Sequence, residues 1–112
     1  MEIKEEIIEE VLVCSINGEI NLDTSPHLRK LFDKAIHNKR KRVLVDFSGV
    51  TYIDSSGLAT LIEMMQKVNK IGGQMRLSNL SDKVRNIFEI TKLDKLFQIY
   101  PDRHRALENF IG

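Results

Sequence analysis

The sequence lacks several features on which whole classes of protein depend. Its 112 residues include a single cysteine, which excludes an internal disulfide framework and leaves too few thiols for a structural zinc site. No apolar run approaches the ~18–20 residues that a membrane span needs. The glutamate-rich start also differs from the basic and then apolar start of an export signal. We therefore expect a soluble, cytoplasmic protein in a reducing environment.

An excess of charge of one sign is missing as well. Seventeen Lys and Arg stand against sixteen Asp and Glu, a net charge of +1, so the charge predicts neither a nucleic-acid partner nor a membrane surface. The one basic cluster, Lys39 to Arg42, is interpreted as solvated charge at the end of a predicted helix. Nucleic-acid binding is the alternative for this cluster, but no interleaved aromatic residues or broader basic face support it.

The signatures of common enzymes are absent. There is no glycine-rich dinucleotide fingerprint, no phosphate-binding loop, no nucleophile elbow and no paired-histidine metal motif. The histidines, His27, His37 and His104, are scattered and are interpreted as surface or packing residues. Cys14 lies in an apolar run, where a lone cysteine usually acts as a small hydrophobe. We expect a protein that is not an enzyme and that has no metal and no cofactor.

The apolar pattern predicts one domain of alternating strands and helices over residues 1–112, undivided by any repeat or linker. Its order, β-β-α-β-α-β-α-β-α, argues for an α/β fold with crossover helices on a mixed sheet. We expect about four to five strands, with four helices packed mainly on one face. The expected strands are an edge strand with Ile3, Ile7 and Ile8, then 11–16 up to a turn at Asn17-Gly18, 43–47 covered on both faces, 75–77 and 96–100. The expected helices are one capped by Thr24 or Ser25, one over 58–68 after a connection at 48–54, one opened by Ser81 or Asp82, and one over Arg105–Ile111.

The segment Asp54-Ser55-Ser56-Gly57 opens the second predicted helix. On physical grounds alone it is a capping turn, in which a serine or the aspartate accepts hydrogen bonds from unpaired backbone N–H groups, and Gly57 allows a close approach of the backbone. The same geometry favours an anion, so the backbone and the helix dipole would hold a phosphate on either serine. Such a phosphate would add about −1.5 to −2 charges beside Asp54. It could therefore abolish the docking of a partner with little effect on the fold.

The string from Val45 to Leu58, VDFSGVTYIDSSGL, resembles the signature of the STAS domain, and specifically that of bacterial anti-sigma factor antagonists. The resemblance covers nearly the whole chain. Earlier, Gly18-Glu19-Ile20-Asn21 is similar to the family's G-x-L-D turn. Further matching positions are Thr24, Pro26, Leu28 and Arg29 at the start of the first helix, and Gly72-Gly73, Leu80-Ser81, Val84 and Phe88 later in the chain.

The resemblance implies a single STAS domain over 1–112 that acts as an anti-sigma factor antagonist. Its implied partner is an anti-sigma factor with serine kinase activity, which binds the unphosphorylated chain and releases it on phosphorylation of Ser55, the serine directly after the aspartate. A PP2C-type serine phosphatase would reset the switch. The family often has Asp at position 21, where Asn keeps an acceptor and loses the charge. The residues expected to contact the partner are Asn21, Thr24, Asp54, Ser56 and Gly57.

Other functions are compatible with parts of the sequence. A STAS domain can also serve as an adaptor or scaffold in another signalling, stressosome or transport complex. A receiver-like domain with Asp46 or Asp54 as phospho-acceptor would need acidic residues after the first internal strand to hold magnesium, and no acid follows that strand before Glu19. An enzyme with Ser55 as nucleophile would need a base, which only tertiary folding could supply, for example from His104.

Overall fold

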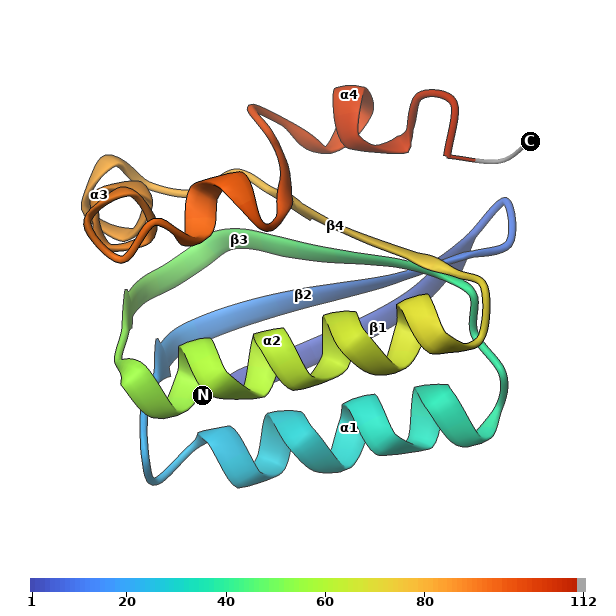
Figure 1. Cartoon of the computed structure of the whole chain (residues 1–112), viewed down its shortest axis with the longest axis horizontal. Helices are drawn as coiled ribbons and strands as arrows, with labels where there is room; N and C mark the ends of the chain where they lie inside the picture. Colours follow the sequence, from blue (N-terminus) through green and yellow to red (C-terminus); the bar gives the residue numbers. More distant parts are fainter. Residues whose placement is uncertain (111–112) are drawn as a thin grey trace.

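The computed structural model describes residues 1–110, in which five strands form one mixed sheet in the order β1-β2-β3-β4-β5 (Figure 1). β1 (Glu2–Ile8) pairs antiparallel with β2 (Val11–Ile20). β3 (Arg42–Ile53), β4 (Gln74–Ser78) and β5 (Gln98–Tyr100) continue the sheet in parallel. The predicted α/β fold with a mixed sheet is confirmed.

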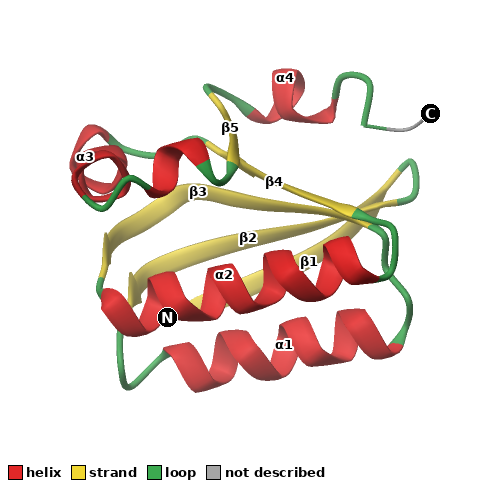
Figure 2. Cartoon of the chain, viewed as in Figure 1, coloured by secondary structure: helices red, strands yellow, loops and turns green. Residues whose placement is uncertain are grey.

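The helices cover the two faces of the sheet unequally. α1 (Ser25–His37) and α2 (Ser55–Lys70) lie side by side on one face, and α4 (Arg103–Leu107) lies on the other (Figure 2). α3 (Asp82–Ile90) joins the core of the first face, where the Phe88 ring makes edge-on contacts with Phe47 and Phe97. Helices packed mainly on one face, as predicted, are therefore found. None of the described helices is long and apolar enough to span a bilayer.

Residues 43–47 of β3 are buried on both faces, as predicted for a central strand. Val43, Val45 and Phe47 point into the main core with α1 and α2. Leu44 points to the other face, into a smaller cluster with Ala106 of α4. Cys14 in β2 is also fully buried, in agreement with its interpretation as a small hydrophobe, and burial together with the charge of Glu5 raises the pKa of its thiol to about 12.

Two predicted strand ends are wrong, because β2 and β3 both run on through segments that were expected to be turns. β2 continues past Asn17-Gly18 to Ile20, and β3 includes residues 48–53 of the expected connection. The pairing of the two strands has register irregularities between Ser15 and Asn17 and between Gly18 and Glu19. Gly18 accommodates one of them with a φ of +110°, which a glycine tolerates.

The last elements are shorter than predicted. The expected strand over 96–100 begins only at Gln98. A 3₁₀ turn over Leu93–Lys95 precedes it, and the backbone N–H groups of residues 96 and 97 still donate to the Leu93 carbonyl oxygen. The expected helix over Arg105–Ile111 is instead the five-residue α4, Arg103–Leu107, and Ile111 lies outside the described residues. α4 starts early because the Asp102 carboxylate accepts a hydrogen bond from the Arg105 backbone N–H at 2.8 Å. It ends early because Glu108 adopts an extended backbone.

Arginine side chains fasten residues 101–110, here called the C-terminal strap, to the second face of the sheet. Arg76 of β4 is buried between the rings of Tyr100 and Phe110 and donates to the carbonyl oxygens of Ala106 and Glu108. Arg103 of the strap itself reaches the sheet by donating to three side chains from three strands, at 2.8–2.9 Å: Glu6, Ser15 and Asp46.

Candidate partner-binding site

The carboxyl ends of β2 and β3 meet at one edge of the sheet, since the two strands run parallel. β2 leads there into the loop 21–24 before α1, and β3 leads into the first turn of α2 (Figure 1). The Asp54 backbone N–H donates to the Ile20 carbonyl oxygen at 3.0 Å. The fold thus brings the loop with Asn21 and Thr24 beside residues 54–57, an arrangement that the family resemblance implied for the Asn21 turn.

The Asp54 carboxylate joins the two segments. One oxygen accepts the Gly57 backbone N–H at 3.0 Å and so caps α2. The other oxygen accepts the Leu22 backbone N–H at 3.1 Å. Of the two capping candidates that the sequence left open, the aspartate therefore caps the helix, and its side chain also fixes the loop that precedes α1.

The two serines that follow Asp54 differ in their exposure. Ser55 is exposed, as the first residue of α2, whereas Ser56 is half-buried. The Ser56 carbonyl oxygen accepts a hydrogen bond from the Thr60 hydroxyl at 3.0 Å, which ties this part of the turn into the helix. Ser55 is thus the more exposed of the two residues at this edge.

Gly57 is buried, and its packing excludes any side chain. A Cβ at this position would lie 2.7 Å from side-chain carbons of both Ile20 and Ile53. The first turn of α2 can therefore approach the ends of β2 and β3 only because residue 57 is glycine. The expected contact of Gly57 with a partner stays a prediction, and the packing supplies an independent reason for a glycine here.

The loop 21–24 is fixed by its own side chains. The Asn21 side-chain oxygen accepts the backbone N–H groups of Asp23 and Thr24 at 3.0 and 3.1 Å. The Thr24 hydroxyl donates to the Glu19 carbonyl oxygen and accepts the Asn21 N–H, both at 2.8 Å. Of the two residues predicted to cap α1, Thr24 occupies the N-cap position, but its side chain makes no capping hydrogen bond because its hydroxyl turns back to the loop. Ser25 is the buried first residue of the helix.

Two exposed apolar residues near this edge were missed from the sequence. The side chain of Leu22 is 71% exposed and that of Tyr52 is 37% exposed. Leu22 sits in the loop whose backbone Asp54 holds, and the Lys83 ammonium lies 5.4 Å from the centre of the Tyr52 ring. A lone leucine between the polar residues Asn21 and Asp23 was the available sequence signal for an apolar contact point.

Asp46, the acceptor considered for a receiver-like domain, is occupied by structural contacts. Its carboxylate accepts hydrogen bonds from the Arg103 guanidinium, the Asn79 side-chain amide and the Ser48 backbone N–H. Burial acts to raise the pKa of Asp46, but these hydrogen bonds outweigh it and hold the pKa below its ordinary value. Within residues 1–110, no group of three or more His, Cys, Asp or Glu side chains is arranged to hold a metal ion. His104, the base considered for an enzyme, is exposed on α4 over the second face of the sheet, whereas Ser55 begins a helix on the first face.

Comparison with known proteins supports this reading of the fold. The family described as STAS domain matches residues 2–106. The anti-sigma-B factor antagonist of Bacillus subtilis is 34% identical over 92 residues, which is 81% of this chain and 83% of that protein. The crystal structure of the Thermotoga maritima protein TM1081 superimposes with a TM-score of 0.92 at 24% identity, over 96% of this chain and 93% of that one. The Bacillus cell fate determinant SpoIIAA, solved in its phosphorylated form, superimposes with a TM-score of 0.73 at 20% identity, over 96% and 97% of the two chains. The two structural likenesses show the fold.

Proposed function

The chain belongs to the STAS domain family, and from this we propose that it is an anti-sigma factor antagonist, as its relative in Bacillus subtilis is named. In this proposal it is a cytoplasmic regulator that binds an anti-sigma factor with serine kinase activity while Ser55 is unmodified. Phosphorylation of Ser55 by that partner releases it, and a PP2C-type serine phosphatase restores the binding form. Catalysis lies with the partners.

One observation carries the proposal: the residue directly after the capping aspartate is an exposed serine. Because the Asp54 carboxylate already caps α2, the fold does not need the Ser55 hydroxyl for that purpose. Ser55 is exposed at the edge where loop 21–24 and α2 meet, and Ser56 is half-buried. This difference favours Ser55 as the acceptor. The fold neighbour SpoIIAA has been solved in a phosphorylated form, which supports a phosphate-controlled switch in this family.

The physical effect of the phosphate differs between the fold and the complex. A phosphoserine carries about −1.5 to −2 charges at neutral pH. At the amino end of α2 the helix dipole favours a negative charge by ~0.3–1 kcal/mol, which offsets part of the repulsion from Asp54. A partner that packs against this edge would have to desolvate both negative charges. The complex is therefore far more sensitive to the modification than the fold is.

Treatment of the purified protein with ATP and the serine-kinase anti-sigma factor of its own cell tests the proposal. Peptide mass spectrometry then maps the phosphate, and calorimetry measures the affinity of each form for the partner. We expect one phosphate on Ser55, no phosphate on the Ser55→Ala variant, and tight binding by the unmodified protein only. Ser48→Ala, at an exposed serine of β3, is the matched control and should be phosphorylated normally. Equal affinity of the phosphorylated and unmodified forms, or a phosphate on Ser56 alone, would contradict the proposal.

A further inference from the structure

The outer edge of β1 is the longer of the two open edges of the sheet. Within residues 1–110, β1 pairs with β2 on one side only, along seven residues. β5, at the other end of the sheet, has three residues. An unpaired edge exposes backbone N–H and C=O groups that can pair with another strand, and proteins usually shorten such edges or cover them. The edge of β1 is neither short nor covered by another described element.

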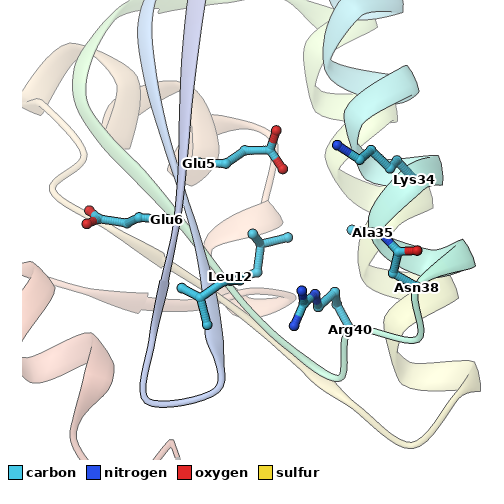
Figure 3. Close-up of a pocket in the computed structure, with 8 residues that line it drawn as sticks. Glu5, Glu6, Leu12, Lys34, Ala35, Asn38 and Arg40 are labelled. Carbon is cyan, nitrogen blue, oxygen red and sulfur yellow. The ribbon is translucent and has the colours of Figure 1, made fainter.

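A hollow lies beside this edge on the helix side of the sheet. It has a volume of about 260 Å³ and runs between β1 and the end of α1, over the buried side chains of Leu12 and Ala35. Glu5 points from β1 toward α1, where Lys34 and Arg40 line the opposite wall, while Glu6 points to the other face (Figure 3). Ile7, which also lines the hollow, is 50% exposed.

The stretch of β1 from Ile3 to Ile7 is complementary to itself on either side of Glu5. We propose that β1 is a self-association edge, at which two copies of this chain pair antiparallel about a two-fold axis at Glu5 to form one continuous sheet. In this register Ile3 lies opposite Ile7 of the second copy, and Lys4 lies opposite Glu6 of the second copy. Symmetry repeats each pair. Opposed apolar residues and opposed opposite charges are the cross-strand pairs that stabilise a sheet.

Charges on both faces of the strand fit this register. On the face that carries the C-terminal strap, Lys4 lies opposite Glu6 of the second copy, so the lysine does not discourage edge pairing as an exposed lysine normally would. On the helix side, the two Glu5 residues face each other at the axis, and Lys34 and Arg40 of both copies line the adjoining hollows. These cations offset the repulsion between the Glu5 carboxylates.

Neighbouring registers do not fit. If the register shifted by one residue, the second copy would have to be inverted relative to the first. Its helices would then lie on the opposite side of the joint sheet. A shift by two residues would place Lys4 opposite Lys4, or Glu6 opposite Glu6. The pairing is therefore specific to the Glu5 axis. Seven paired residues bury less than the ~1,200–2,000 Å² of stable interfaces, so the dimer is reversible and its population depends on concentration.

Sedimentation equilibrium of the purified chain, from micromolar concentrations to about 1 mM, the weak end of measurable association, tests the proposal. The wild type should shift from monomer toward dimer, whereas Ile7→Lys should stay monomeric. Ile90→Lys is the matched control, because Ile90 is also an exposed isoleucine, 71% exposed on α3, and it should associate like the wild type. A wild type that is monomeric throughout, or an Ile7→Lys variant that dimerises like the wild type, would overturn the proposal.

A charge exchange tests the register itself. Lys4→Glu and Glu6→Lys each place like charges opposite one another in the homodimer, and each should weaken self-association by about tenfold or more. Mixed in equal amounts, the two variants regain both opposite-charge pairs and should dimerise with each other. Because Glu6 also pairs with Arg103 at 2.8 Å, a thermal melt checks the fold of Glu6→Lys. Absence of heterodimer from two folded variants would overturn the register, and the Ile7→Lys comparison decides the edge independently.

Discussion

The Asp54 carboxylate holds the backbone N–H of Leu22 at 3.1 Å, across 32 positions of the chain. With its other oxygen it accepts the Gly57 N–H at 3.0 Å. One side chain thus sets the position of α2 and of the loop before α1 relative to each other. The shape of the surface that we propose as the partner-binding site therefore depends on this carboxylate, together with the hydrogen bonds that Asn21 and Thr24 make within the loop.

Replacing Asp54 by alanine should lower the free energy of unfolding by about 1–2 kcal/mol, the usual cost of removing a helix cap. It should also release the Leu22 backbone N–H, which becomes visible as faster hydrogen exchange at that amide. Chemical denaturation measures the first effect and NMR exchange the second. Asp23→Ala, at an exposed carboxylate in the same loop, is the control and should change stability by less than about 0.5 kcal/mol. Normal protection of the Leu22 amide in Asp54→Ala would contradict the role assigned to this carboxylate.

Replacing Gly57 by alanine should destabilise the protein by about 1–3 kcal/mol, because the added methyl group overpacks a closed site. The new Cβ would come within 2.7 Å of both Ile20 and Ile53, so either these side chains or the first turn of α2 must shift. A thermal or urea melt measures the loss. Ser55→Ala, two residues earlier and exposed, makes a nearby change without that overlap and should melt close to the wild type. A Gly57→Ala variant as stable as Ser55→Ala would show that the packing adjusts freely.

Ser55→Asp should bind the anti-sigma partner at least about tenfold more weakly than Ser55→Ala, because a charge at this edge opposes docking. Ser55→Ala should bind regardless of kinase activity. Both affinities can be measured by calorimetry. Ser48→Asp carries the same added charge at an exposed position of β3 and separates a local effect from one of net charge. If Ser48→Asp weakens binding as much as Ser55→Asp, the position of the charge does not matter and Ser55 is not the switch.

The Asp46–Arg103 contact should make stability fall in acid. The pKa of Asp46 is held below its ordinary value in the folded protein, so its stabilising contribution is present above about pH 4, the ordinary range of a carboxyl group. That contribution is lost as the pH falls through the lowered pKa. Arg103→Met should cost about 1–3 kcal/mol at pH 7, toward the lower end because the arginine is 35% exposed.

Denaturation of the wild type and Arg103→Met across the pH range checks this assignment. The difference in stability between them should shrink below pH 4. Arg105→Met, at a more exposed arginine of the same helix, serves as the control and should show a small difference at every pH. A wild-type advantage over Arg103→Met that stays constant down to pH 2 would contradict it.

The strands show where sequence reasoning succeeds and where it stops. The inward residues of β2, such as Leu12, Cys14 and Ile16, alternate regularly, and the strand was found. The inward residues at the end of β3 are Phe47, Val50 and Ile53, spaced by three because of the register irregularities with β2. That spacing hides the alternation on which a strand prediction depends. Residues 48–53, the second half of β3, were therefore predicted as a loop and not as a strand.

The sequence identified the segments that form the candidate site, but not the contacts that hold them together. The sequence of residues 54–57 indicated a helix cap that could hold a phosphate on either serine, and the resemblance to the STAS family associated this segment with the turn at Asn21. The hydrogen bond from Leu22 to Asp54 could not be predicted, because it depends on the parallel pairing of β2 with β3. The exposure of Leu22 was missed for the same reason: only the folded loop shows which side of it faces solvent.

At the start of α2, Asp54 caps the helix, and the neighbouring residue, Ser55, is exposed. In evolutionary terms, the two can therefore change separately. Under the proposed switch, a single substitution at position 55 would convert a regulated protein into a permanently active or permanently silent one without a compensating change elsewhere, whereas position 54 is constrained by its hydrogen bonds within the fold. Descendants of one ancestral domain can in this way keep the same architecture while they gain or lose control by phosphate.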